Sequence, residues 1–220
     1  SIASMGFTHV WYTGVIRHAS TTNYPFMSRR ANANVVKGKA GSPYAICDYY
    51  DIDPDLAEDV NSRMDDFKRL VERTHETGLK VLIDFVPNHV ARNYYSDCEP
   101  NRPMFGGSDC TDCRFAQNNN FYYIVGQSFR APETNLDVEY TEIPAKASGN
   151  DAFTATPTKT DWYEAVKLNY GVDYVDGSKY FSPIPDTWFK MRDILMYWAS
   201  MGIDGFRVDM AEMVPVEFWR

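Results

Sequence analysis

The sequence predicts an α/β fold with parallel strands, because three segments share one plan and helical segments separate them. In each segment the end of a helix is followed by a glycine and then by a short apolar strand. Near-continuous apolar runs are typical of strands that are buried on both faces of a parallel sheet. The glycines and their strands are Gly6 with residues 7–12, Gly78 with residues 81–86, and Gly202 with residues 205–209.

Two amphipathic helices are expected before the second and third strands. The first covers residues 62–77, with Ser62 and Asp65 as a capping box at its start. The second covers residues 187–201, with Asp186 as its N-cap. Such alternation of strand and helix predicts β–α units. One face of each helix is apolar: Met64, Phe67, Leu70 and Val71 in the first, and Trp188, Met191, Leu195 and Trp198 in the second.

A stretch from residue 90 to residue 185 interrupts this pattern. It is rich in Asn, Asp, Gly, Pro and Tyr, it has no long helical period, and it contains three of the four cysteines. A structureless loop of this length is uncommon inside a compact domain. We therefore expect an inserted, irregular and β-rich subdomain made of short strands and turns.

The position of the insert predicts a β/α barrel with its active site beside the insert. In such barrels the loops that follow the strands form the catalytic face. A full (β/α)8 TIM barrel needs roughly 250 residues, and only about 125 remain here outside the insert. We expect a partial barrel, truncated at both ends, with barrel segments at 1–89 and 186–220 around the insert at 90–185.

Composition excludes two classes of function. The net charge of −8 and the isoelectric point near 5.0 argue against nucleic-acid binding, which needs clustered Lys and Arg. No apolar run approaches the roughly 18 residues that a membrane span requires. Aromatic residues make up 15% of the chain, which weakly favours a carbohydrate ligand because flat rings stack on sugar rings.

The strongest candidate for chemistry is the pair Arg207 and Asp209. The two residues lie two apart on a predicted strand, so their side chains point to the same face. A neighbouring arginine lowers the pKa of a carboxyl group and keeps it ionised, as a carboxylate nucleophile requires. By themselves these two residues favour a structural Arg–Asp pair at a strand end.

A second cluster follows the strand at residues 81–86. Asp84 lies near the end of the strand, Pro87 stops it, and Asn88 and His89 begin the next loop. In a barrel this arrangement places all three polar side chains at the mouth. A lone histidine is more often a hydrogen-bonded structural residue than a functional one.

Taken together, these segments resemble the α-amylase superfamily, glycoside hydrolase family 13. Residues 84–89 resemble its first signature region, an apolar strand ending in Asp-x-x-x-Asn-His, and residues 205–209 resemble the Gly-Phe-Arg-x-Asp of its second. Residues 42–54, which include Tyr44, resemble the family's Gly-Tyr-x-x-x-Asp-Tyr segment after strand two. The resemblance spans essentially the whole chain and corresponds to strands two to four plus the inserted domain B after strand three.

The resemblance implies a role for each matching residue. Asp209 would attack the anomeric carbon and form a covalent glycosyl–enzyme intermediate, with Arg207 holding its carboxylate ionised and oriented. His89 would donate hydrogen bonds to the sugar being cleaved, and Tyr44 would provide a stacking face beneath it. Asp84 belongs to the same substrate site and would brace Arg207.

The implied activity is retaining hydrolysis of α-1,4-linked glucans such as starch or maltooligosaccharides. Retention needs a second carboxyl group as general acid/base. In this family that Glu follows in strand five, and we expect it beyond Arg220. The alternatives are an α-glucan transglycosylase or isomerase of the same family, and a non-catalytic glycan-binding relative. The chain also departs from many starch amylases, because Met210-Ala211-Glu212-Met213 replaces a segment with a Lys-His pair on the acceptor side.

The resemblance also implies a possible Ca²⁺ site and no organic cofactor. Asn88 matches a calcium-ligand position of some family members, and oxygen atoms of domain B would complete the site. Two clusters in the insert, residues 161–164 and residues 167–171, fit either a substrate-facing edge of domain B or a packed turn.

The cysteines leave three readings open. They are compatible with a structural zinc site, with a disulfide or with free thiols. A disulfide in the insert favours a secreted or periplasmic enzyme. The four residues are Cys47, Cys98, Cys110 and Cys113.

Overall fold

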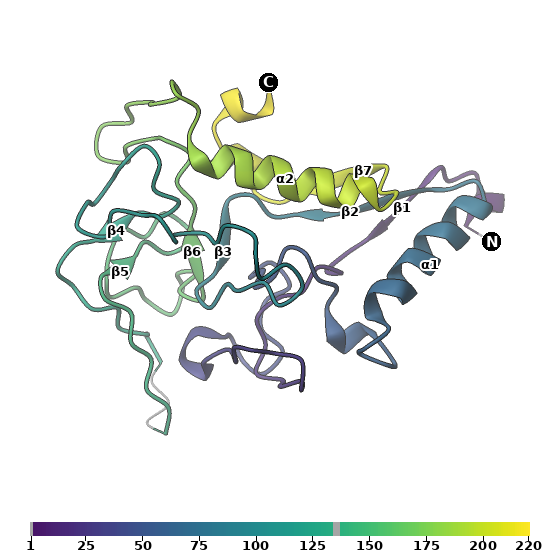
Figure 1. The fold of residues 1–220 in the computed structure, drawn as a ribbon, viewed down its shortest axis with the longest axis horizontal. Coiled ribbons are helices and arrows are strands. Elements are labelled where there is room, and N and C mark those ends of the chain that lie inside the picture. The colour runs from purple at the N-terminus through teal and green to yellow at the C-terminus, as the bar shows by residue number, and fades with distance from the viewer. Residues whose placement is uncertain (1, 134–136) are drawn as a thin grey trace.

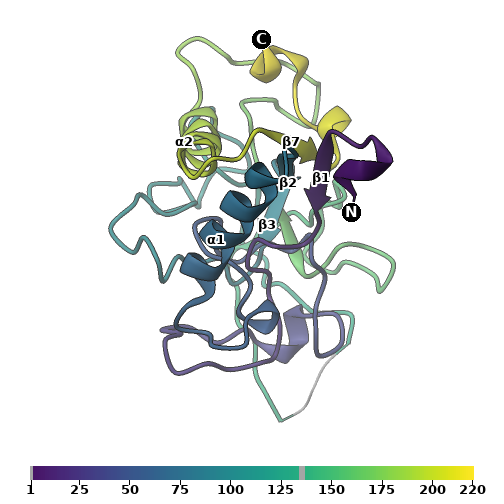
Figure 2. The same ribbon diagram turned by 90° about the vertical axis from the view of Figure 1, so that its right-hand side faces the viewer.

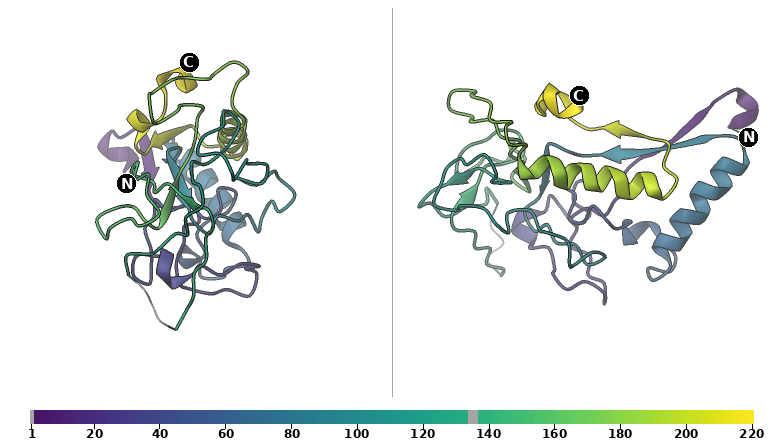
Figure 3. Two further views of the ribbon diagram at one scale, coloured as in Figure 1. Left: turned by 90° about the vertical axis from the view of Figure 1, so that its left-hand side faces the viewer. Right: turned by 45° about the horizontal axis from the view of Figure 1, so that its top comes forward.

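A computed structural model describes residues 2–133 and 137–220, and its central element is a sheet of three parallel strands. The strands are β1 (His9–Tyr12), β2 (Lys80–Phe85) and β7 (Gly205–Val208), in the order β1-β2-β7 (Figures 1 and 2). The expected strands and their parallel arrangement are thus confirmed; β1 and β7 are shorter than expected, and β2 is displaced by one residue. The carboxyl ends of the strands face the insert (Figure 3).

Two helices cover one side of this sheet (Figure 2). They are α1 (Arg63–Glu76) and α2 (Asp186–Ser200), and they meet where the Phe67 ring packs edge-on against Trp198 at 5.7 Å between centroids. Trp198 is fully buried, so it anchors α2 in the core beneath the sheet. Short 3₁₀ helices are found at Ala3–Met5, Ala33–Val35, Pro54–Leu56, Ala211–Met213 and Val216–Trp219.

The expected helix ends are confirmed and the starts lie within one residue of those expected, whereas the expected capping contacts are wrong. Gly78 and Gly202 have φ angles of +79° and +89°, the left-handed conformation that ends a helix most easily at glycine. At the start of α1, the Ser62 hydroxyl donates to Asp66 instead of capping the backbone. At the start of α2, Pro185 is the N-cap, and the carboxylate of Asp186 instead lies 2.8 Å from the Nζ atom of Lys190.

The first glycine follows the same rule. Gly6 has φ +86° and ends the 3₁₀ helix Ala3–Met5, as expected for the last turn of a helix. Ser1, which we expected in that turn, lies outside the described residues.

The insert consists of short antiparallel strands and turns, as expected. β3 (His89–Ala91) pairs with β6 (Ala165–Lys167), and β4 (Tyr123–Ile124) pairs with β5 (Ala145–Lys146). These strands lie beside the carboxyl ends of the central sheet (Figures 1 and 3). Buried insert residues such as Val166 belong to the same hydrophobic core as β2. The boundaries of a separate domain at 90–185 stay a prediction.

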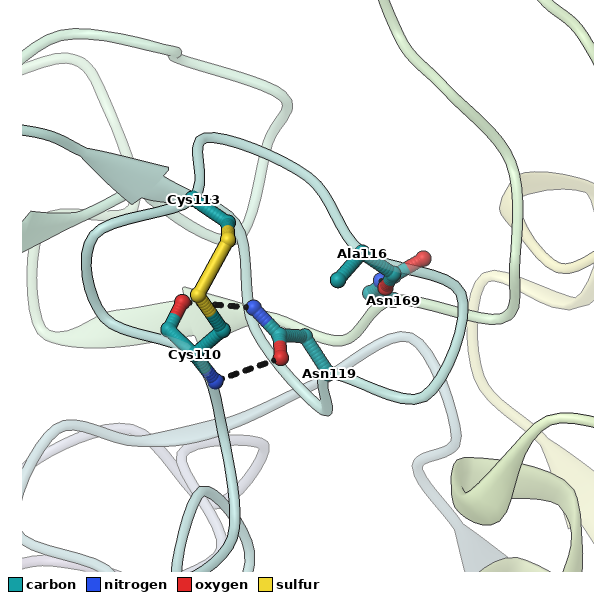
Figure 4. Close-up of a disulfide and its surroundings, with 5 residues drawn as sticks. All are labelled: Cys110, Cys113, Ala116, Asn119 and Asn169. Atoms are coloured by element: carbon teal, nitrogen blue, oxygen red, sulfur yellow. Dashed lines mark hydrogen bonds between the residues drawn. A yellow bond between two sulfur atoms is a disulfide. The ribbon is translucent and has the colours of Figure 1, made fainter.

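The cysteines resolve into one disulfide and two thiols. Cys110 and Cys113 are bonded to each other in a tight turn, which the side-chain amide of Asn119 closes with hydrogen bonds of 2.8 and 2.9 Å to the backbone of Cys110 (Figure 4). Cys47 and Cys98 are free thiols. The zinc reading is therefore wrong, because two of its ligands bond to each other, and the disulfide reading is confirmed.

Charged side chains are buried in the long connection between β1 and α1. Arg63 binds the Asp51 carboxylate with both Nε (2.7 Å) and Nη2 (2.9 Å), and Arg17 lies 3.4 Å from the same carboxylate. Asp48, Asp51 and Cys98 lie close enough together to form a ligand set for a metal ion. The two guanidinium groups already neutralise this cluster, so its function in the fold is a buried ion-pair network.

We expect Asp51→Asn to lower the free energy of unfolding by about 3 kcal/mol, because it removes the buried carboxylate that Arg63 binds with two nitrogen atoms and that also faces the buried Arg17. The matched control is Asp65→Asn, which breaks only an exposed pair with Lys68 and should cost less than about 1 kcal/mol. Urea denaturation followed by circular dichroism measures both changes. Equal costs for the two variants would contradict the network.

No helix within residues 2–133 and 137–220 is long and apolar enough to cross a membrane.

Candidate active site

The ends of β2 and β7 bring an arginine between two carboxylates. Asp84 is paired with Arg207 in the strand register, and Asp209 follows β7 directly. The Nη1 atom of Arg207 donates to Asp84 Oδ1 at 3.3 Å and to Asp209 Oδ1 at 3.0 Å. The second Asp84 oxygen accepts a hydrogen bond of 2.8 Å from the backbone of Gly14, in the loop after β1. Asp84 thus joins Arg207 to the loop after β1.

The backbone around Asp209 is held in an unusual turn. Its N–H donates to the carbonyl of Phe85 at 2.8 Å, which continues the pairing with β2 by one residue. The next residue, Met210, has φ +50°, a left-handed conformation that costs a non-glycine residue about 1–2 kcal/mol. Such strain persists where surrounding contacts impose it, and it is found most often at functional sites.

The pKa of Asp209 is raised above its ordinary value, with burial as the largest cause. The positive charge of Arg207 acts in the opposite direction, and Asp84 and Glu212 raise the pKa further. The sequence alone indicated a lowered pKa, because it showed the arginine and not the burial. The side chain lies in a partly desolvated position, where a carboxylate is a better nucleophile than in water.

His89 and Tyr44 line the same cavity as Asp209. The volume of this cavity is about 310 Å³. The centroid of the Tyr44 ring lies 5.5 Å from the guanidinium carbon of Arg207. The cavity walls come from the connection between β1 and α1, from the insert and from the segment after β7: Lys37, Ser42, Tyr44, Ala45, His89, Trp162, Glu164, Ala165, Asp209 and Met210. Of the six expected site residues, three line this cavity: Tyr44, His89 and Asp209. Arg207 and Asp84 lie beside it, because Arg207 contacts both Asp209 and Asp84.

The pKa of His89 is lowered to about 4, mainly by burial and also by the positive charge of Lys167. The imidazole is therefore neutral at neutral pH. Its Nδ1 atom accepts a hydrogen bond of 3.0 Å from the side-chain amide of Asn88, which assigns the ring proton to Nε2. The neutral ring also has a hydrogen bond with the Tyr44 backbone, and it lines the cavity in which a sugar hydroxyl would lie.

Asn88, the sixth expected residue, faces an ammonium group. Its Oδ1 atom accepts a hydrogen bond of 2.5 Å from Lys167, which also lies 2.8 Å from Asp151 Oδ1 and 3.3 Å from the carbonyl of Met213. These three oxygen atoms come from the end of β2, from the insert and from the segment after β7. A calcium ion needs such oxygen atoms itself and is repelled by an ammonium group. The residues present therefore do not fit Ca²⁺ at Asn88.

Residues 161–164 include both side chains that face the candidate site and side chains that pack within the turn. Trp162 and Glu164 line the cavity of Asp209, whereas Tyr163 is buried in a separate hydrophobic cluster and Asp161 accepts hydrogen bonds that hold the local turn. Sequence reasoning missed Lys37 as a cavity residue, because nothing in its local sequence marks it.

Glu212, at the departure from the family pattern, gives a testable pH effect. Its negative charge raises the pKa of Asp209, so Glu212→Gln should lower that pKa. Asp209 then stays ionised to lower pH, and the acid limb of the kcat/KM profile should move to lower pH by less than about one unit. Glu217→Gln is the control, because Glu217 pairs with Lys179 at 2.7 Å and does not contribute to the pKa of Asp209. An unmoved limb in Glu212→Gln would show that this limb does not report Asp209.

A parallel sheet thus carries an aspartate–arginine pair at its carboxyl end, beside a cavity lined by Tyr44 and Trp162. The family description "Alpha amylase, catalytic domain" matches residues 2–218, and the chain belongs to this family. Its homologues include glycoside hydrolases and transglycosylases of glycoside hydrolase family 13.

Among curated relatives, Alpha-amylase 3 of Dictyoglomus thermophilum is 26% identical over 80% of this chain and 29% of its own length. The cyclomaltodextrin glucanotransferase of Bacillus sp. (strain 1011) is 24% identical over 97% of this chain and 24% of its own length. The amino acid transporter heavy chain SLC3A1 of Rattus norvegicus is 25% identical over 78% of this chain and 21% of its own length. The chain thus spans between a fifth and a third of these relatives.

The native debranching enzyme of Nostoc punctiforme shares the fold. The two structures align with a TM-score of 0.55 at 19% identity, over 99% of this chain and 32% of that chain. The fold of this chain therefore corresponds to about a third of that larger structure.

Proposed function

We propose that this chain carries the nucleophile of a retaining α-glycosidase that acts on α-1,4-linked glucans such as starch or maltooligosaccharides. The observation that supports it best is the placement of Arg207 between Asp84 and Asp209 at the edge of the cavity that Tyr44 and His89 line. This arrangement supplies an oriented carboxylate, a ring for stacking and a neutral imidazole in one place.

In the proposed mechanism, Asp209 attacks the anomeric carbon from the face opposite the leaving group and forms a covalent glycosyl–enzyme intermediate. Arg207 holds the attacking oxygen in place and limits the rise of its pKa. The general acid/base is proposed to be a Glu C-terminal to Arg220, about 5–5.5 Å from Asp209 in the complete (β/α)8 barrel. Water then attacks the intermediate, and the two inversions give net retention.

Transglycosylation is the second candidate, because a cyclomaltodextrin glucanotransferase is among the relatives and a second cavity beside the segment after β7 could hold an acceptor. Glu212 and Met213 stand where many starch amylases carry Lys and His, and they line a second cavity of about 690 Å³ next to the nucleophile. An acceptor sugar bound there would compete with water for the intermediate.

The test is ¹H NMR of the complete catalytic domain with maltoheptaose, recorded from the first minutes of reaction. A retaining hydrolase releases the α-anomer first, and the β-anomer then grows by mutarotation. Oligosaccharides longer than seven units would assign the reaction to transfer. First release of the β-anomer would contradict the nucleophile, and no reaction with several α-glucans would favour a non-catalytic glycan-binding protein.

A further inference from the structure

We propose that Lys37, Trp162 and Glu164 form a sugar-recognition wall of the Asp209 cavity, in which the Glu164 carboxylate and the Lys37 ammonium group bind glucan hydroxyls and the Trp162 ring packs on a sugar face. This inference rests on the proposed function and extends it by assigning substrate recognition to three residues outside the signature motifs.

Glu164 is a buried carboxylate with unused hydrogen-bonding capacity. The residue is 6% exposed, yet within the described residues its Oε2 atom makes no hydrogen bond. That atom lies 3.2 Å from Lys37 Nζ, an ion-pair contact. A carboxylate can accept about four hydrogen bonds, and buried polar groups ordinarily satisfy most of theirs. Lys37 is the ion-pair partner of this oxygen, and its remaining acceptor capacity at the cavity is available to ligand hydroxyls.

Lys37 is held in a fixed position from several sides. Its ammonium group donates to the carbonyl of Asp161 at 3.1 Å and lies 5.2 Å from the Tyr163 ring centroid, in addition to its contact with Glu164. Its side chain keeps about a third of its surface exposed. A charged group that is already ordered loses little conformational entropy when a ligand binds.

Trp162 supplies the apolar component of the wall. Its ring lies 5.2 Å from the His89 ring, so it borders the part of the cavity that the catalytic-site histidine also faces. Its backbone N–H donates to Asn150 at 3.1 Å, which fixes the turn that carries it. An aromatic plane next to a carboxylate and an ammonium group matches a pyranose ring, which presents C–H faces and hydroxyl edges together.

The alternative is an ion pair that serves the fold alone, and substrate kinetics separate the two. Glu164→Gln keeps the shape of the side chain and removes its charge. For the complete enzyme on maltoheptaose we expect KM to rise about tenfold, the loss typical of a hydrogen bond to a charged group, with kcat changed by less than about twofold. Trp162→Leu should raise KM by a similar factor. Glu133→Gln, which breaks the exposed pair with Lys159 in the same insert, should leave both constants unchanged.

Binding is measured independently by calorimetric titration of maltoheptaose into the Asp209→Asn variant, with and without Glu164→Gln. A Kd about tenfold weaker in the double variant, with an unchanged melting temperature, is the expected result. If the enzyme is active and neither Glu164→Gln nor Trp162→Leu changes KM or Kd, the proposed recognition role of these residues is wrong and the proposed glycosidase activity is unaffected. An enzyme that neither binds nor cleaves α-glucans would overturn both.

Discussion

Asp209→Asn is expected to lower kcat on maltooligosaccharides by on the order of 10⁴-fold or more, the scale of losses seen when an enzyme loses its nucleophile. The amide cannot form the covalent intermediate, yet it matches the carboxylate in shape. The Asp209 backbone N–H still pairs with Phe85, so the fold is expected to stay intact. Initial rates with maltoheptaose and the melting temperature of the complete enzyme give the two readouts.

The control for this prediction is Asp193→Asn on α2. Asp193 is exposed and pairs with the neighbouring Arg192 at 2.8 Å, away from the cavity. This variant should retain wild-type rates. Residual activity of Asp209→Asn within tenfold of wild type would assign the nucleophile to another residue.

Lys167→Met is expected to lower the free energy of unfolding by about 3 kcal/mol. Because Lys167 occupies the place of a cation at Asn88, removal of calcium is expected to leave the melting temperature of the complete enzyme unchanged. The ammonium group of Lys167 joins three segments through Asn88, Asp151 and Met213. Its removal leaves the buried Asn88 oxygen atom without its donor. Differential scanning calorimetry in EDTA and in CaCl₂ measures both effects.

Substitution by aspartate makes the calcium comparison sharper. Lys167→Asp adds a carboxylate to the oxygen atoms that now surround the ammonium group, which is the type of ligand set that Ca²⁺ prefers. This variant should be unstable in EDTA and regain stability in CaCl₂. Lys179→Met, which breaks an exposed pair with Glu217, should show neither effect. A wild-type enzyme that melts earlier in EDTA and recovers with CaCl₂ would contradict the role of Lys167.

The fold was predictable where local signals agree with burial. Gly78 and Gly202 mark helix ends because their positive φ angles are a local requirement, and the apolar runs after them pair as parallel strands. The capping contacts at the helix starts were not predictable, because distant or neighbouring polar groups compete for the capping side chains. Asp186 illustrates this: Lys190 and Asn120 bind the carboxylate that was expected to cap α2.

The candidate site was predictable as far as its motifs extend. Asp84 and Asp209 lie at the carboxyl ends of β2 and β7 and His89 follows β2 by a few residues, so their convergence follows from the parallel sheet. The direction of the Asp209 pKa was not predictable, because the burial that raises it depends on segments far away in the sequence. Lys37 was missed for the same reason, and the importance of Lys167 depends on its contact with Met213, 46 residues later.

The most direct test of the nucleophile is to trap the intermediate on the complete enzyme. Incubation with 5-fluoro-α-D-glucosyl fluoride should accumulate the glycosyl–enzyme, because the fluorine slows both steps and the good leaving group favours the first. Peptide mass spectrometry after acid quench is predicted to find the fluoroglucosyl mass on the peptide that contains Asp209, and to find none in Asp209→Asn. A label on a different carboxylate would contradict the assignment of Asp209.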